Sequence, residues 1–222
     1  MKEKEYMRLE SDSIGTMEVP EDAYYGVQAL RAKENFPITG TKLHPVFIKN
    51  LAKIKRAAAI TNRKAGRLKP EIANAIEASA NEVICGMFDK DFIVDGIQGG
   101  AGTSANMNMN EVIANRAIEM LCGKKGDYTI VHPNDHVNRA QSTNDVIPTA
   151  GKLTVLDLLK PLDKSLSLLT DALYDKAAAF DHIVKIGRTQ LEDAVPMRLG
   201  QTFHSYATMI SRDRDRLTKC IP

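Results

Sequence analysis

The sequence contains no tryptophan, few other aromatic residues and little cysteine. Aromatic residues make up 5% of the 222 residues, and the 3 cysteines are Cys85, Cys122 and Cys220. Three widely spaced cysteines do not form a disulfide framework, so a small disulfide-rich secreted scaffold is excluded. We therefore expect reduced thiols in a cytoplasmic protein.

An excess of charge of one sign and long apolar runs are also missing. The chain has 30 Lys and Arg against 28 Asp and Glu, which gives a net charge of +2. This balance excludes a nucleic-acid partner held mainly by phosphate contacts. No run approaches the roughly 18 apolar residues of a membrane span, so we expect no membrane attachment. The 43% of hydrophobic residues is enough for a globular core.

Apolar residues recur at helical spacing along most of the chain and predict a mainly α protein. The expected helices cover residues 45–65, 70–86, 106–122, 142–179 and 197–219. The third should carry Met109, Ile113, Ala117 and residues 120–121 on one side, and the fourth should be kinked or interrupted at Pro161.

The remaining segments show little strand character. Residues 92–94 and 128–131 are the best strand candidates, and strands do not alternate with helices as they would in a doubly wound sheet. The irregular stretch 123–141 separates shorter helices from longer ones. We therefore expect one domain over residues 1–141 and the start of a second over 142–222.

Three segments interrupt the helical pattern with small hydroxyl and amide residues. They are residues 98–106 (QGGAGTSAN), 132–145 (HPNDHVNRAQSTND) and 187–194 (GRTQLEDA). The first two lie just before a predicted helix, where unpaired N–H groups and the helix dipole attract anions. Hydroxyl and amide groups add hydrogen bonds without charge, and Arg188 supplies a cation. This combination indicates a site for a small anion such as a dicarboxylate.

Structural explanations for the same residues stay open. Ser142, Thr143 and Asn144 fit a simple N-cap as well as a binding site. His132 and Asp135 fit a turn with satisfied side chains as well as an acid–base pair.

Other binding chemistries are disfavoured by the sequence. His132 and His136 have the spacing of metal ligands on a helix, but Pro133 argues against a regular helix there. We therefore expect no metal. The glycine loop at 99–102 lacks the Lys-Ser/Thr ending of a P-loop and the preceding strand of a dinucleotide site, so we expect no nucleotide.

The three segments, in this order and spacing, resemble the aspartase/fumarase superfamily, and most closely its aspartate ammonia-lyase members. The resemblance also includes RLESD at 8–12, VPEDAYYGVQ at 19–28 and ENFPI at 34–38. It implies a helical domain followed by a bundle of long helices, of which this chain supplies the first two. Phe203, Ile210 and Leu217 should then form an apolar stripe with too few partners.

The resemblance implies reversible removal of ammonia from L-aspartate to give fumarate, with no organic cofactor. It assigns substrate binding to Thr103, Ser142, Thr143, Asn144 and Thr189. It suggests supporting roles for Gln190, Arg188, Ser104, Asn106, His132, Asn134 and Asp135, the last three from a secondary anion site of fumarases. Fumarases have histidine where this chain has Gln190, so ammonia elimination is favoured over hydration, with class II fumarase as the alternative.

The catalytic base of the family is a serine on a downstream loop of the pattern Gly-Ser-Ser-x-Met-Pro-x-Lys-x-Asn. This sequence has no such loop, so we expect no catalytic residue in it and no activity from these 222 residues alone. The resemblance also implies a homotetramer whose subunits together complete each pocket. Two hypotheses follow: part of an aspartate ammonia-lyase, or a truncated chain without catalysis.

Overall fold

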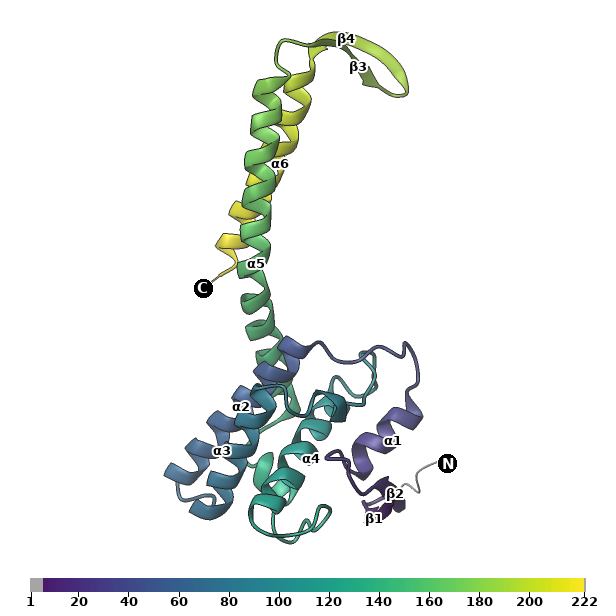
Figure 1. Ribbon diagram of the computed structural model, residues 1–222, viewed down its shortest axis with the longest axis vertical. Helices are drawn as coiled ribbons and strands as arrows, with labels where there is room; N and C mark the ends of the chain where they lie inside the picture. Colours follow the sequence, from purple (N-terminus) through teal and green to yellow (C-terminus); the bar gives the residue numbers. More distant parts are fainter. Residues whose placement is uncertain (1–5, 222) are drawn as a thin grey trace. The chain divides into compact units, whose positions relative to one another are not determined.

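The computed structural model describes residues 6–221, and Figure 1 shows its ribbon. The chain divides into two compact units between Thr154 and Val155. The division falls inside the long helix α5 (Thr143–Ala179), so the first turns of α5 belong to the first unit. The domain boundary predicted between residues 141 and 142 concerns the larger family fold and stays a prediction.

Within residues 6–154, a β-hairpin precedes a group of helices. Strands β1 (Met7–Ser11) and β2 (Thr16–Pro20) pair antiparallel, with Met7 opposite Pro20. The α-helices before α5 are α1 (Val27–Asn35), α2 (Pro45–Lys64), α3 (Pro70–Ile84) and α4 (Thr103–Met120). Two single-turn elements complete the unit, the 3₁₀ helix η1 (Asp89–Asp91) and the π-helix η2 (Pro133–Val137).

The mainly α fold class is confirmed, and helical spacing predicts α2, α3 and α5 well. α2 and α3 both start at a proline, which is tolerated in the first turn. Each ends shortly before a glycine of positive φ, Gly66 at 65° and Gly86 at 82°. The two predicted strands are wrong. Phe92, Val94 and Val131 are buried, but as core side chains of irregular segments.

α4 is buried on nearly all sides, and not only on the apolar side of Met109, Ile113 and Ala117 that helical spacing predicts. Its apolar residues Met109, Val112 and Ile113 are 0% exposed and join the core formed with α2 and α3. Its buried polar residues are Asn106, Asn108, Asn110, Glu111 and Asn115. These side chains can be buried because most of them bind groups from other segments.

Glu111 anchors the start of α1. Its carboxylate accepts backbone hydrogen bonds from Gly26, Gln28 and Ala29 at 2.8–3.0 Å. These N–H groups have no partner inside the helix, so a carboxylate at the helix start satisfies them. Because this contact comes from 82 to 85 residues away in the chain, local sequence signals do not predict α1.

In the second unit, the rest of α5 is followed by a hairpin and by α6 (Leu199–Lys219). The hairpin strands are β3 (Val184–Thr189) and β4 (Glu192–Arg198), which helical spacing does not predict. α5 and α6 lie side by side (Figure 1), with the rings of Phe180 and Phe203 5.5 Å apart. Arg214 and Asp163 form an ion pair at 2.8 Å between the same helices.

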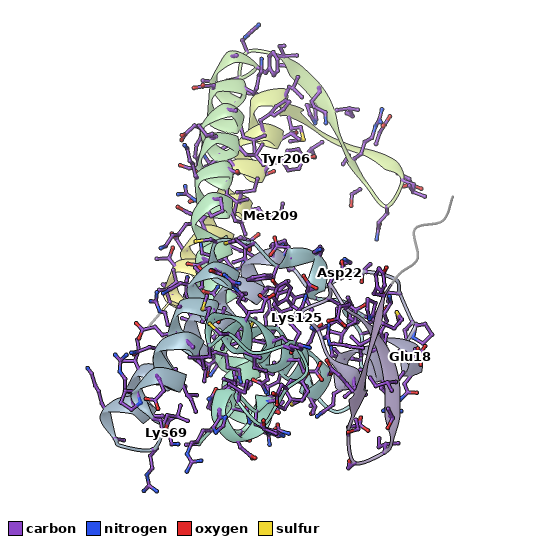
Figure 2. All side chains as sticks on the ribbon, turned by 60° about the horizontal axis from the view of Figure 1, so that its bottom comes forward. Glu18, Asp22, Lys69, Lys125, Tyr206 and Met209 are labelled. Carbon is purple, nitrogen blue, oxygen red and sulfur yellow. The ribbon has the colours of Figure 1, made fainter. Side chains whose placement is uncertain are left out.

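α5 runs past Pro161 without a break, so the predicted interruption is wrong. Pro161 is exposed, and solvent can compensate for the backbone hydrogen bond that proline does not make. Phe203, Ile210 and Leu217 are partly buried rather than fully exposed. The exposed apolar residues of α5 and α6 include Leu158, Leu162, Leu168, Leu169, Tyr206 and Met209, of which Figure 2 labels the last two.

No helix in residues 6–221 has both the length and the apolar character needed to cross a bilayer.

Burial raises the pKa of Glu111 from 4.5 to about 7. Between these pH values the folded chain keeps a proton that the unfolded chain releases, so stability falls as pH rises. We expect the free energy of unfolding to fall by up to about 1.4 kcal/mol per pH unit here, relative to Glu111→Gln. Urea titrations at several pH values measure it. Glu119→Gln on the same helix should keep the decline, and parallel curves for wild type and Glu111→Gln would contradict the prediction.

Candidate anion site at two helix starts

The first polar segment forms a tight loop that leads into α4. Residues 100–102 all have positive φ values, between 51° and 89°. Gln98 closes the loop, because its Oε1 accepts a hydrogen bond from the backbone N–H of Ala105 at 2.6 Å. Thr103 is exposed, and its hydroxyl donates to the carbonyl of Gly100 at 2.6 Å, while Ser104 is half-buried. The loop thus presents the start of α4 on a fixed backbone.

Gly102 brings this loop against α5. A Cβ at this position would lie 2.8 Å from Cγ2 of Ile147, on the second turn of α5. Since φ at Gly102 is also 89°, only glycine fits both the conformation and the contact. The first and second polar segments are therefore adjacent in the first unit.

The second polar segment ends as the start of α5. Ser142 caps this helix: its Oγ accepts from the N–H of Asn144 at 3.2 Å and its carbonyl from the N–H of Val146 at 3.1 Å. The N-cap interpretation of Ser142 is therefore confirmed. Thr143 is half-buried and Asn144 is exposed. A helix start with exposed polar side chains has the donors that bind an anion.

Asn106 joins the two helix starts. Its Nδ2 donates to Oγ1 of Thr143 at 3.2 Å and to Oδ1 of Asn138 at 3.1 Å. The same Oδ1 accepts from Nζ of Lys55 on α2 at 2.8 Å. Lys55 is 0% exposed, and burial lowers its pKa from 10.5 to about 7. A partly buried chain of hydrogen bonds therefore runs from Lys55 on α2 through Asn138 and Asn106 to Thr143.

His132 and Asp135 form a structural turn. Nδ1 of His132 accepts from the N–H groups of Asn134 and Asp135, both at 3.2 Å, and so caps η2. The carboxylate of Asp135 is 3.5 Å from the same nitrogen, with its side chain 76% exposed. His136 accepts from the N–H of His132 at 2.9 Å, and burial lowers the pKa of His136. This geometry favours a turn with satisfied side chains over an acid–base pair.

The third polar segment is the tip of the β3–β4 hairpin in the second unit. Thr189 pairs with Glu192, and Gln190 and Leu191 between them have φ values of 51° and 66°, as in a two-residue hairpin turn. Thr189, Gln190 and Arg188 are all exposed. The structure thus brings the first two segments together in one unit, and the third belongs to the other.

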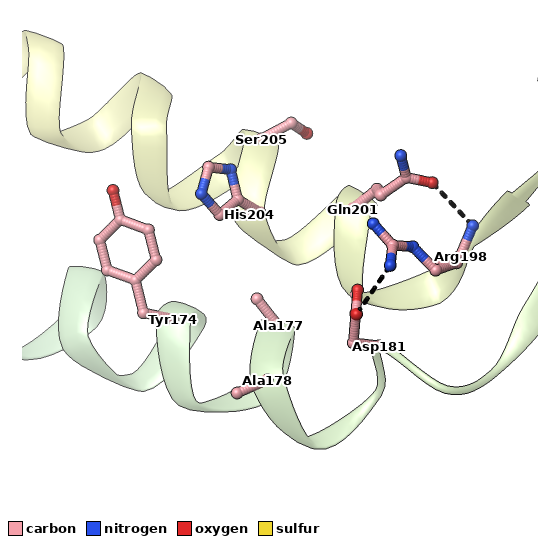
Figure 3. Close-up of a pocket in the computed structure, with 9 residues that line it drawn as sticks. Tyr174, Ala177, Ala178, Asp181, Arg198, Gln201, His204 and Ser205 are labelled. Atoms are coloured by element: carbon pink, nitrogen blue, oxygen red, sulfur yellow. Dashed lines mark hydrogen bonds and ion pairs between the residues drawn. The ribbon is translucent and has the colours of Figure 1, made fainter.

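Two cavities have linings that do not include the predicted substrate residues. One of about 610 Å³ borders the loop before α4 and includes Gln98, Gly102 and Ile147 in its lining. The other, of about 680 Å³, lies between α5 and α6 in the second unit (Figure 3). There the rings of Tyr174 and His204 pack edge to face, with their centroids 5.4 Å apart. In the first unit, the candidate anion site is therefore a surface made by two helix starts.

Sequence reasoning missed Lys55, Asn138 and Gln98. Lys55 lies four residues from both Leu51 and Ala59, which are buried on the same face of α2. A lysine at a position of the apolar face of a helix is unusual, and this pattern could have indicated from the sequence that Lys55 is buried. Asn138 and Gln98 belong to the polar segments, but nothing in the sequence distinguishes them from their neighbours.

Comparison with known proteins gives consistent matches. A family model described as lyase matches residues 15–222. An aspartate ammonia-lyase from Bacillus sp is 51% identical over 211 residues, covering 95% of this chain and 45% of that relative. A fumarate hydratase class II from Halobacterium salinarum is 52% identical over 216 residues, covering 97% of this chain and 46% of that relative. The chain spans about half the length of the relatives it matches.

Solved structures agree with these matches. The fumarate lyase:delta crystallin from Brucella melitensis superimposes with a TM-score of 0.89 at 46% identity. The match covers 96% of this chain and 50% of that one. A class II fumarase from Schistosoma mansoni has a TM-score of 0.83 at 38% identity, covering 95% and 44% of the two chains.

The buried position of Lys55 predicts a second pH effect. Its pKa is lowered to about 7 in the folded chain, so the unfolded chain binds an extra proton between about pH 7 and 10.5. The stability that the uncharged Lys55 side chain contributes is therefore fully present above pH 10.5. It decreases as the pH falls from 10.5 and is lost as the pH falls through 7. In the wild type we expect the free energy of unfolding to rise with pH over this range, by up to about 1.4 kcal/mol per pH unit. In Lys55→Met this rise should be absent.

Urea titrations from pH 7 to 10.5 check this prediction. Lys53→Met on the same helix is the matched control, because Lys53 is only half-buried. The control should keep the wild-type slope. A wild-type slope equal to that of Lys55→Met would show that Lys55 keeps its charge in the folded chain.

Proposed function

Because this chain belongs to the lyase family of the aspartases and fumarases, we propose that it forms part of an aspartate ammonia-lyase. Such an enzyme converts L-aspartate to fumarate and ammonia. The observation that carries the proposal is Gln190 directly after Thr189, where fumarases have histidine. Identity of 51% to curated aspartate ammonia-lyases agrees with it but does not by itself separate it from the fumarase reaction.

The chemistry of the two helix starts suits this substrate. In the elimination, a base removes a proton from the β carbon, the electron pair forms the C=C bond, and the C–N bond breaks to release ammonia. The carboxylate next to the β carbon gains negative charge in the intermediate. Neutral donors at helix starts, such as Ser142, Thr143 and Asn144, stabilise such a charge without a competing counter-ion. Thr103 would join them only by giving up its hydrogen bond to the carbonyl of Gly100. Thr189 would add a donor from the hairpin tip.

The catalytic base would come from outside these residues. The serine loop of the family does not occur in residues 1–222. We therefore propose that the chain contributes substrate-binding groups rather than a catalytic residue. The exposed apolar side chains of α5 and α6 support assembly with further helices, in a homotetramer.

Class II fumarase is the second candidate. The relative from Halobacterium salinarum is 52% identical, slightly above the aspartate ammonia-lyases. Hydration of fumarate to malate passes through a similar charged carboxylate, so the same helix starts serve both reactions. The two candidates differ in the group that leaves, ammonia or water.

Assays of the protein encoded by the whole reading frame around these residues separate the candidates. We expect fumarate formation from L-aspartate, followed by ultraviolet absorbance, and no turnover of malate. Thr143→Ala should lower kcat by roughly 100-fold, about 3 kcal/mol, because one donor to the developing charge is lost. Thr143→Ser keeps the hydroxyl and should retain most activity. Malate turnover without ammonia release would instead assign the fumarase reaction.

The 222-residue chain by itself should form no fumarate from L-aspartate, because it lacks the serine loop. The measurement is the same absorbance assay on the purified chain, with circular dichroism to establish that it is helical. Turnover that Thr143→Ala abolishes would show that these residues contain a base of their own.

A further inference from the structure

The hydroxyl of Thr143 is held in a fixed orientation. Nδ2 of Asn106 donates to its Oγ1 at 3.2 Å, so the hydroxyl is the acceptor in this contact. The hydroxyl hydrogen then points away from Asn106. In the part of the chain that the structure describes, Thr143 shows no second side-chain hydrogen bond. Its hydrogen is therefore available to an anion at the start of α5.

Asn106 is itself held by a second asparagine. One Nδ2 group donates both to Thr143 and to Oδ1 of Asn138, which fixes the rotation of the Asn106 amide. Nζ of Lys55 donates to the same Oδ1 at 2.8 Å. Nδ2 of Asn138 donates to the carbonyl of Gln141 at 3.1 Å, directly before Ser142. Asn138, whose own amide is held by Lys55 and by the carbonyl of Gln141, thus supplies the acceptor toward which the Nδ2 group of Asn106 is turned.

Burying the side chains of Lys55 and Asn106 lowers the stability of the folded chain. Lys55 and Asn106 are 0% and 2% exposed, and Oδ1 of Asn106 is buried without a partner among the described residues. A buried lysine and an unpartnered amide oxygen both reduce stability, whereas an apolar side chain at position 55 would not. Stability alone therefore does not explain the polar chain.

We propose that Lys55 and Asn138 are positioning residues that orient Thr143, through Asn106, as a hydrogen-bond donor to the substrate carboxylate. The effect on catalysis rests on the proposed function, whereas the orientation of Thr143 does not. Lys55 acts from α2, outside all three polar segments. Neither residue touches substrate in this role.

Crystal structures of the complete encoded protein test the orientation directly. In Lys55→Met and in Asn138→Leu, we expect the Thr143 side chain to leave its wild-type rotamer or occupy several. Asn138→Asp keeps the acceptor oxygen and should restore the wild-type rotamer. Asn62→Leu is the matched control, because Asn62 is a buried asparagine on α2 that binds the carbonyl of Arg139 instead.

A double-mutant cycle tests the consequence for the reaction. In the wild-type background, Lys55→Met should lower kcat by about 10- to 100-fold with a smaller change in KM, since the hydroxyl is misplaced. In a Thr143→Val background, which has no hydroxyl, the same substitution should change kcat less than about twofold. Asn62→Leu should have equal, small effects in both backgrounds.

Two results would overturn the proposal. One is an unchanged Thr143 rotamer in both Lys55→Met and Asn138→Leu. The other is an equal loss of kcat on Lys55→Met in the two backgrounds, which would assign Lys55 a structural role independent of Thr143. An absence of aspartate turnover in the wild type would refute the proposed function only, and the crystal structures would still decide the orientation.

Discussion

The first unit depends on the buried polar side chains of α4. Asn108 donates to the carbonyl of Asp91 at 2.9 Å and accepts from the N–H of Ile93, which fixes the segment after η1. Asn115 and Glu111 bind backbone groups of the segments before α1 and after α4. Losing such a partner would leave a buried polar group that costs about 1–3 kcal/mol. Segments with little regular structure are therefore attached to one rigid helix.

The candidate site is an extension of the same arrangement. Asn106 stands one turn into α4 and binds Thr143, so the helix that fixes the irregular segments also fixes the start of α5. The close contact of Gly102 with Ile147 adds a steric constraint at the same place. Two helix starts with their N–H groups are thus held together by one hydrogen bond and one packing contact, both within the first unit. A surface of two helix starts can bind an anion without a charged side chain beside it, because N–H groups and neutral side chains supply the hydrogen-bond donors.

Part of this arrangement can be predicted from the sequence. The rest cannot, because it depends on contacts between residues that are far apart in the chain. Periodicity locates α2, α3 and α5, because their burial follows from local spacing. It fails for α1, whose N-terminal N–H groups bind Glu111, 83 residues further along the chain. It also fails for the polar residues of α4. Asparagines are predicted to be solvent-exposed unless the distant groups that form hydrogen bonds with them are known. The polar segments are visible in sequence, but their connection through Lys55 is a tertiary contact.

Overall identity does not separate the two candidate reactions, since relatives of both kinds match at 51% and 52%. The shared part of the chemistry is the negative charge that develops on a carboxylate, and the shared part of the structure is the pair of helix starts that suits it. Discrimination must then come from groups near the leaving group. Gln190 lies at an exposed hairpin tip, next to Thr189, and carries a neutral amide that neither gains nor loses a proton. A histidine there would titrate near neutral pH, so this one position would change the proton chemistry of the proposed site without altering the two helix starts.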